Sequence, residues 1–188
     1  MSFAARQATC QTATNENTYY DTITVYYNNT SKLKNEFIPD SVFQLYNLIE
    51  LSIQGMDCDY RLSDENGNDI TECWMISEIP LQIKNLKKLE QLRLNVNAIT
   101  KIPKEIVELK NLKSIDLNDN MGLSDISYLM KLENLEELGL YGCGLTKLPP
   151  NIGELHKLKY LGLSGNQIDS IELNRIKKAL PNCKIYFE

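Results

Sequence analysis

The chain has 188 residues, of which 43% are hydrophobic and 24% are charged, the ordinary usage of one globular domain large enough to bury a continuous core. Its formal net charge of −5 gives no electrostatic signature for nucleic acid or an anionic membrane, so neither is expected as a partner. No stretch is long and apolar enough to predict a membrane-spanning segment. The opening residues, MSFAARQATC, have neither a basic leader nor an apolar core, so as written they predict no export signal.

Residues 1–21 are predicted to be a loose entry segment, because their polar start shows no period. The domain is expected to occupy 22–188. Its first unit is the run TITVYYNN from Thr22, which alternates like a strand and places Ile23 and Val25 inward. The following FIPDSVFQL matches a later KIPKEIVEL position by position, which indicates that the same unit recurs along the chain.

The second unit, LYNLIELSIQGM, places Leu51 and Ile53 inward. The next unit begins 41 residues after this one instead of 23, so a segment of 18 residues is inserted at about 57–74. Its centre, DENG, has strong turn chemistry between short alternating runs. A protruding β-hairpin is therefore predicted.

Two turn registers of this hairpin stay open. A four-residue DENG turn sets Cys58 opposite Cys73, and a disulfide between them would place the protein in an oxidising compartment. A two-residue turn at Asn66-Gly67 leaves both thiols free. The acidic residues do not form a calcium loop, because Leu62 and Cys73 would fall at its first and twelfth positions. No metal site is predicted.

Four lines recur every 23 residues from Leu86: LKKLEQLRLNVN, LKNLKSIDLNDN, LENLEELGLYGC and LHKLKYLGLSGN. Apolar residues occupy the first, fourth, seventh and ninth places, and the last two alternate as in a strand with one buried face. One unit cannot bury its own apolar stripe, so stacked copies are expected to form a parallel sheet. Asn97, Asn120 and Asn166 close their lines and are expected to bond adjacent backbone, with Cys143 as a packing residue in the same slot.

This pattern resembles the leucine-rich repeat family, L-x-x-L-x-L-x-x-N/C-x-L, over roughly residues 20–188. The resemblance implies an α/β solenoid with a curved parallel β-sheet on its concave side and short helices or 3₁₀ turns on its convex side. The steps Ile79-Pro80, Ile102-Pro103 and Leu148-Pro149 resemble those of 23-residue repeats in bacterial and Ras-group proteins. After Asn120, apolar residues recur every three positions, which favours a 3₁₀ segment.

The last stretch, about 171–188, contains no further repeat line. Ile176 and Leu180 lie four apart on a helix face, Pro181-Asn182 ends that helix, and Ile185 and Phe187 alternate as a last strand. A closing cap is predicted, and it resembles the ALPNCKI endings of bacterial leucine-rich repeat domains.

No catalytic site and no cofactor are predicted. The one histidine, His156, aligns with Lys110 on an exposed turn, and the one nucleophile that could pair with it, Cys143, points into the core. The glycines at 139, 142, 162 and 165 recur with the repeat and do not form a phosphate-binding loop.

The outward columns of the sheet are polar, mildly acidic and rich in tyrosine, a residue enriched at interfaces. The residues predicted to contact a partner are Tyr26, Arg93, Asn95, Asp116, Asn118, Tyr141 and Tyr160. The first hypothesis is a non-catalytic protein–protein interaction module that binds through this sheet and the overhanging hairpin. The alternative is a surface adhesion protein that recognises glycans. A secreted or surface location in a bacterium is favoured, with a cytoplasmic location as the alternative.

Overall fold

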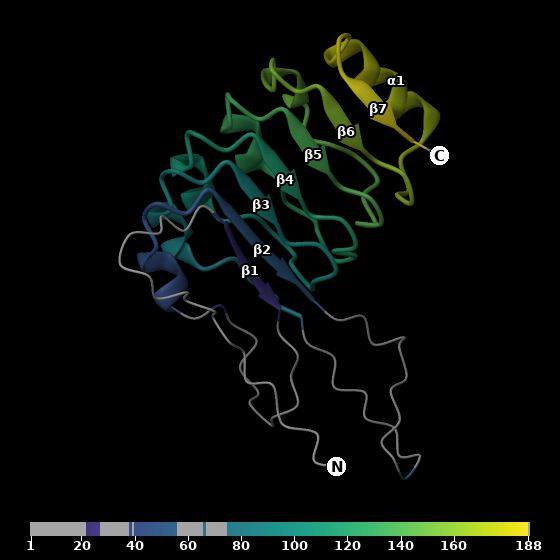
Figure 1. Cartoon of the computed structure of the whole chain (residues 1–188). Coiled ribbons are helices and arrows are strands. Elements are labelled where there is room, and N and C mark those ends of the chain that lie inside the picture. The colour runs from purple at the N-terminus through teal and green to yellow at the C-terminus, as the bar shows by residue number, and fades with distance from the viewer. Residues whose placement is uncertain (1–21, 27–37, 39, 56–65, 67–74, 188) are drawn as a thin grey trace.

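The computed structural model describes residues 22–26, 38, 40–55, 66 and 75–187 (Figure 1). Within them, one parallel sheet has the strand order β1 to β7, so every strand pairs with its neighbours in sequence. The strands are β1 (Thr22–Tyr26), β2 (Glu50–Gln54), β3 (Gln91–Arg93), β4 (Ser114–Asp116), β5 (Glu137–Gly139), β6 (Tyr160–Gly162) and β7 (Lys184–Tyr186). Since all strands run the same way, each connection must return along the back of the sheet.

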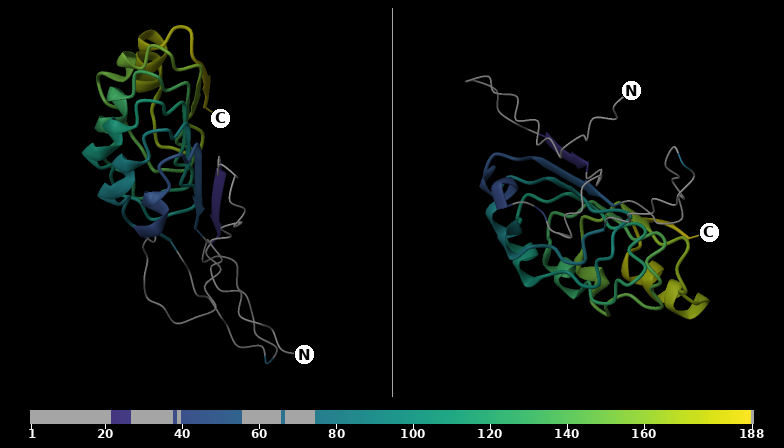
Figure 2. Two further views of the ribbon diagram at one scale, coloured as in Figure 1. Left: turned by 60° about the vertical axis from the view of Figure 1, so that its left-hand side comes forward. Right: turned by 90° about the horizontal axis from the view of Figure 1, so that it is seen from below.

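The connections carry short helices on the side opposite the strands (Figure 2, left). They are the 3₁₀ helices η1 (Asp40–Gln44), η2 (Leu81–Asn85), η3 (Lys104–Glu108), η4 (Ser127–Lys131) and η5 (Ile152–Glu154), and the α-helix α1 (Ser170–Ala179). At each Ile/Leu-Pro step the proline carbonyl accepts a hydrogen bond from the isoleucine N–H three residues later, as in Ile106 to Pro103 at 3.1 Å. The proline fixes φ and starts the turn. The predicted convex helices are thus confirmed.

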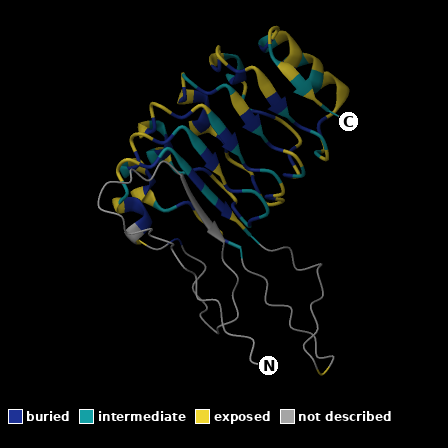
Figure 3. Cartoon of the chain, viewed as in Figure 1, coloured by how far each residue is buried: buried dark blue, intermediate teal, exposed yellow. Residues whose placement is uncertain are grey.

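The core is a set of apolar columns enclosed between the strands and the helices (Figure 3). The buried strand and post-strand residues are Leu51, Ile53, Leu92, Leu94, Ile115, Leu117, Leu138, Leu140, Leu161 and Leu163. Ile83, Ile106, Leu129 and Ile152 close the core from the helix side. These are the positions that the repeat assigned inward, so the predicted α/β leucine-rich solenoid and its register are confirmed.

The asparagine that closes a repeat line ties successive coils together. Asn97 Nδ2 donates to the carbonyl oxygens of Ile53 at 2.9 Å and Leu94 at 3.0 Å, and Asn97 Oδ1 accepts from the N–H of Ile76 at 3.0 Å. Asn120 makes the same set of bonds one coil later. Both side chains are buried, so these amides satisfy backbone groups of adjacent coils in the interior.

Cys143 fills the asparagine slot of the next coil. Its buried thiol donates to the carbonyl oxygen of Leu117 at 3.2 Å. Asn166, one coil further, again donates to Leu140 and accepts from Leu145. The thiol therefore supplies the donor of the asparagine and also packs as an apolar group, as the sequence predicted.

The backbone turns out of the sheet through a left-handed residue once per repeat. Val96, Asp119, Gly142 and Gly165 have φ between +56° and +71° and are 23 residues apart. Gly55 lies against the first of these turns, and a Cβ atom built on it would overlap the Val96 carbonyl oxygen. Successive coils therefore approach backbone to backbone at this edge of the sheet.

The last described coil consists of α1 and β7, in the stretch where the sequence predicts a cap. Asp169 caps the helix by accepting the N–H of Glu172 at 2.7 Å. The Glu172 side chain, on a residue only 8% exposed, accepts two bonds from Arg175 and one from the Leu148 N–H. Arg175 in turn donates to the Leu148 carbonyl at 3.0 Å. This clamp fixes α1 to the loop of the preceding repeat.

The entry segment 1–21, the insertion at 57–74 apart from Asn66, and the cysteines Cys58 and Cys73 lie outside the described residues, so their predictions stand untested. Among the described residues, no helix is long and apolar enough to cross a membrane.

Candidate partner-binding face

The predicted contact residues lie in adjacent columns on the strand side of the solenoid. The parallel register aligns Ser52, Arg93, Asp116, Gly139, Gly162 and Tyr186 in one column. Asn95, Asn118 and Tyr141 follow two residues after column members, and Tyr160 precedes Gly162 by two. Tyr26 ends β1 beside Gln54, and its side chain is not described. We call the strand side, from β2 to β7, the concave face.

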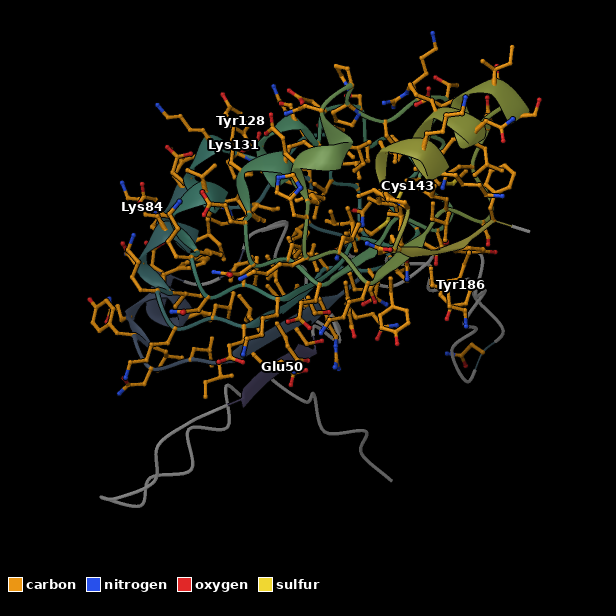
Figure 4. The ribbon with its side chains drawn as sticks, turned by 90° about the horizontal axis from the view of Figure 1, so that it is seen from above. Glu50, Lys84, Tyr128, Lys131, Cys143 and Tyr186 are labelled. Atoms are coloured by element: carbon orange, nitrogen blue, oxygen red, sulfur yellow. The ribbon has the colours of Figure 1, made fainter. Side chains whose placement is uncertain are left out.

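The part of the face nearest β2 is occupied by an ion pair. Arg93 contacts Glu50 at 3.0 Å and also donates to the side chain of Gln91 at 3.1 Å. Glu50 lies on the strand side of the molecule in Figure 4, opposite Lys84, Tyr128 and Lys131. Arg93 is exposed and its charge is already balanced, so its guanidinium could contact a partner without bringing an unpaired charge to the interface.

At the centre of the face, Asp116 and Asn118 lean over Gly139. A Cβ atom on Gly139 would stand 3.1 Å from Asp116 Oδ1 and 2.9 Å from Asn118 Oδ1. Asp116 Oδ1 accepts the N–H of Asn118 at 3.0 Å, and Asn118 Oδ1 accepts the N–H of Tyr141 at 2.7 Å. These two predicted contact residues are therefore also positioning residues for Tyr141.

Three half-exposed tyrosines dominate the end of the face nearest β7. Tyr141, Tyr160 and Tyr186 are 49%, 45% and 47% exposed. The Tyr141 ring rests over Gly165, where a Cβ would stand 3.2 Å from Cε2. The Lys184 ammonium lies 4.8 Å from the centroid of the Tyr186 ring. The sequence reasoning missed Tyr186, although its alternation with Ile185 places it on the outward side of the last strand.

Cys143 and His156, the nucleophile and base considered from the sequence, lie away from this face. Cys143 is buried between the sheet and the helices (Figure 4), and burial raises the pKa of its thiol to about 11, so it is protonated at neutral pH. His156 lies on an exposed turn. Within the described ranges, no three His, Cys, Asp or Glu side chains form a group that could hold a metal ion. The arrangement on the face offers contact surface and hydrogen bonds.

Many lysine and glutamate side chains are used between coils. The pairs are Lys87–Glu108, Lys113–Glu90, Lys131–Glu154 and Lys159–Glu136, with distances of 2.6–3.3 Å. On the concave face, by contrast, Asp116 and Glu137 are in no ion pair with another described residue. Glu137 accepts only the Ser114 hydroxyl, at 3.2 Å. Two carboxylates without an ion-pair partner among the described residues therefore lie near the tyrosines, as does the Lys184 ammonium.

Comparison with known proteins gives a consistent family. The family model described as Leucine Rich repeats (2 copies) matches residues 133–182. A leucine-rich repeat protein of Leptospira interrogans is 30% identical, with a TM-score of 0.62 over 81% of this chain and 40% of its own. No curated protein sequence matches.

Two further solved structures share the fold. An internalin of Listeria monocytogenes is 20% identical, with a TM-score of 0.54 over 78% of this chain and 45% of its own. The leucine-rich repeat domain of the type III effector XopL is 24% identical, with a TM-score of 0.56 over 80% of this chain and 56% of its own. The chain thus spans about half the length of these three solved chains.

Proposed function

Because this chain is a leucine-rich repeat protein, a fold that serves as a general protein-interaction module, we propose that it is non-catalytic and binds a protein partner through its concave face. The observation that carries this proposal is the set of exposed aromatic side chains held on rigid strands. Interface hot spots are enriched in tyrosine and arginine, and both types stand outward here at Arg93, Tyr141 and Tyr160.

Preorganisation supports the assignment. Tyr141 has its backbone N–H bound by Asn118 and its ring seated over Gly165. A ring that is already held in place loses little conformational entropy when a partner covers it. The inserted segment 57–74 follows β2, and its predicted hairpin would add contacts at the rim of the same face.

The test compares two triple variants. The face variant carries Arg93→Ala, Tyr141→Ala and Tyr160→Ala. The control carries Lys84→Ala, Tyr128→Ala and Lys131→Ala, which removes one tyrosine and two cationic side chains from the helix side (Figure 4). Proteins captured from an extract of the source organism on the immobilised chain are identified, and the most enriched one is purified for calorimetric titration.

The face variant is expected to bind that partner at least about 100-fold more weakly, because two or more hot-spot side chains are lost. The control should bind within about twofold of the parent. Both should keep the parent circular dichroism spectrum, since exposed side chains contribute little to the core. Full partner binding by the face variant, with loss of binding by the control, would show that the binding site lies on the helix side.

A further inference from the structure

The concave face contains one side-chain position that is empty. A Cβ atom built on Gly162 would meet only backbone atoms, none nearer than 3.8 Å. Its neighbour Gly139 is different, because the side chains of Asp116 and Asn118 already cover it. Gly162 also has no positive φ that would require glycine. Neither close packing nor backbone conformation therefore requires glycine at this position.

The walls of this space, which we call the Gly162 opening, come from four side chains. Tyr160 lies two residues earlier on the same strand, and Tyr186 lies beside Gly162 on β7. On the other side, Asp116 Oδ1 reaches over Gly139. Strands lie about 4.8 Å apart and same-face residues about 6.7 Å apart, so these side chains come from the positions next to Gly162 or one strand further. Tyr141, seated over Gly165, borders it diagonally.

The electrostatics of the opening favour a cation. Asp116 and Glu137 bring two negative charges that no described residue balances in an ion pair, and Lys184 brings one positive charge, which is placed against the Tyr186 ring at 4.8 Å. The chain thus already uses one of these rings to hold an ammonium group. A neutral ligand would cover the carboxylate of Asp116 without balancing its charge, which disfavours it.

We propose that the Gly162 opening receives the guanidinium group of an arginine side chain presented by the protein partner. The inference rests on the proposed function and specifies its chemistry. Guanidinium is flat, stacks on aromatic rings and donates in a fork that matches a carboxylate. Lysine has the charge but not the flat face, and a sugar has the flat face but not the charge. Comparing arginine, lysine and sugar probes therefore distinguishes an arginine occupant from the other two.

The experiment titrates the full chain with small probes while its backbone amide signals are followed by NMR. The probes are acetyl-Gly-Arg-Gly-amide, the same tripeptide with citrulline or lysine in place of arginine, and diacetylchitobiose. Citrulline matches arginine in shape but is neutral. The arginine peptide is expected to shift the signals of residues around Gly162 and to bind about tenfold more tightly than the citrulline peptide.

Three variants fix the location. Gly162→Val fills the opening with a side chain that suits a strand and whose Cβ meets only ordinary contacts, and it should abolish the arginine-peptide shifts. Asp116→Asn removes the charge but keeps the Oδ1 acceptor for the Asn118 N–H, so it should weaken binding about tenfold with the fold intact. Ser52→Val, in the same column on β2, is the matched control and should bind like the parent.

Stronger shifts with diacetylchitobiose than with the arginine peptide would overturn the inference in favour of a glycan. Equal binding of the arginine and citrulline peptides would overturn it as well. Binding assays with the purified partner distinguish failure of the arginine proposal from failure of the proposed function. If Gly162→Val and Asp116→Asn keep the partner while the triple face variant loses it, the face binds protein but the opening takes no arginine.

Discussion

Gly55 shows how strictly one residue can be fixed by its neighbours. Its N–H donates to the Asn95 carbonyl at 3.3 Å, and the Val96 carbonyl oxygen occupies the place where a side chain would begin. Because the Val96 carbonyl belongs to the backbone, no rotamer change can relieve that contact. The close approach of the coils therefore requires glycine at this position.

Gly55→Ala should lower the free energy of unfolding by about 3 kcal/mol or more, because either β2 or the turn at Val96 must move. Urea denaturation measures the change. Gly162→Ala is the matched control, since its Cβ meets only ordinary contacts, and its effect should stay within about 1 kcal/mol. Equal stability of the two variants would contradict the close approach at Gly55.

The residue-level predictions succeeded where the role of a side chain depends only on its position in the repeat. The buried leucines and the asparagine slot follow from the repeat period, and the structure has them as expected. The tilt of Asp116 and Asn118 over Gly139 does not follow from it, because it depends on a missing side chain in the next coil. The left-handed turns at Val96 and Asp119 carry no glycine to mark them.

At the scale of elements, the strands, the proline-led 3₁₀ turns and the closing helix could all be predicted. Each has a local signal, such as the alternation at Leu92 and Leu94 or the stop at Pro181-Asn182. The clamp between Glu172 and Arg175 had no such signal. An i, i+3 pair of opposite charge is common on helix surfaces, and only the packing of α1 against the Leu148 loop buries this one.

Glu172→Gln tests that clamp through its pH dependence. Hydrogen bonds from Arg175 hold the pKa of Glu172 below its ordinary value of 4.5, and the Leu148 N–H acts in the same direction. The folded state thus favours the ionised carboxylate, and this stabilisation is present above the ordinary value and disappears as pH falls below it. At pH 7 the variant should be about 1–3 kcal/mol less stable.

The difference between parent and Glu172→Gln should shrink as pH falls below about 4.5, because the unfolded parent then binds a proton at Glu172 before the folded parent does. Chemical denaturation at several pH values measures it. Glu133→Gln, which changes an exposed glutamate, should follow the parent at every pH. A difference that stays constant down to pH 3 would show that the ionised clamp does not stabilise the cap.

For the whole molecule, stability should depend on unbroken stacking of the coils. Each strand pairs only with its sequence neighbours, so a defect in a central coil weakens two interfaces at once. Leu117 lies in such a coil and is fully buried. The length and period of the repeat predict this architecture, whereas the partner cannot be predicted from it, because the outward columns are free to vary without disturbing the core.

Leu117→Ala should lower the free energy of unfolding by about 2–5 kcal/mol, because the cavity cannot close without disturbing both neighbouring coils. Leu81→Ala is the control, since that side chain is 57% exposed on η2 and should matter little. Thermal denaturation followed by circular dichroism compares them. An unchanged melting temperature for Leu117→Ala would mean that the repeat register is wrong.

The constant register of the sheet spaces the residues of the concave face at regular intervals. Residues 23 apart are direct neighbours from β3 to β6, so one coil advances the surface by about 4.8 Å along the solenoid axis. Arg93 on β3 and Tyr160 on β6 are thus three coils apart. A partner that contacts both residues must match their spacing as well as their chemistry. An extra coil inserted between them would therefore prevent binding, although every contact residue would be unchanged.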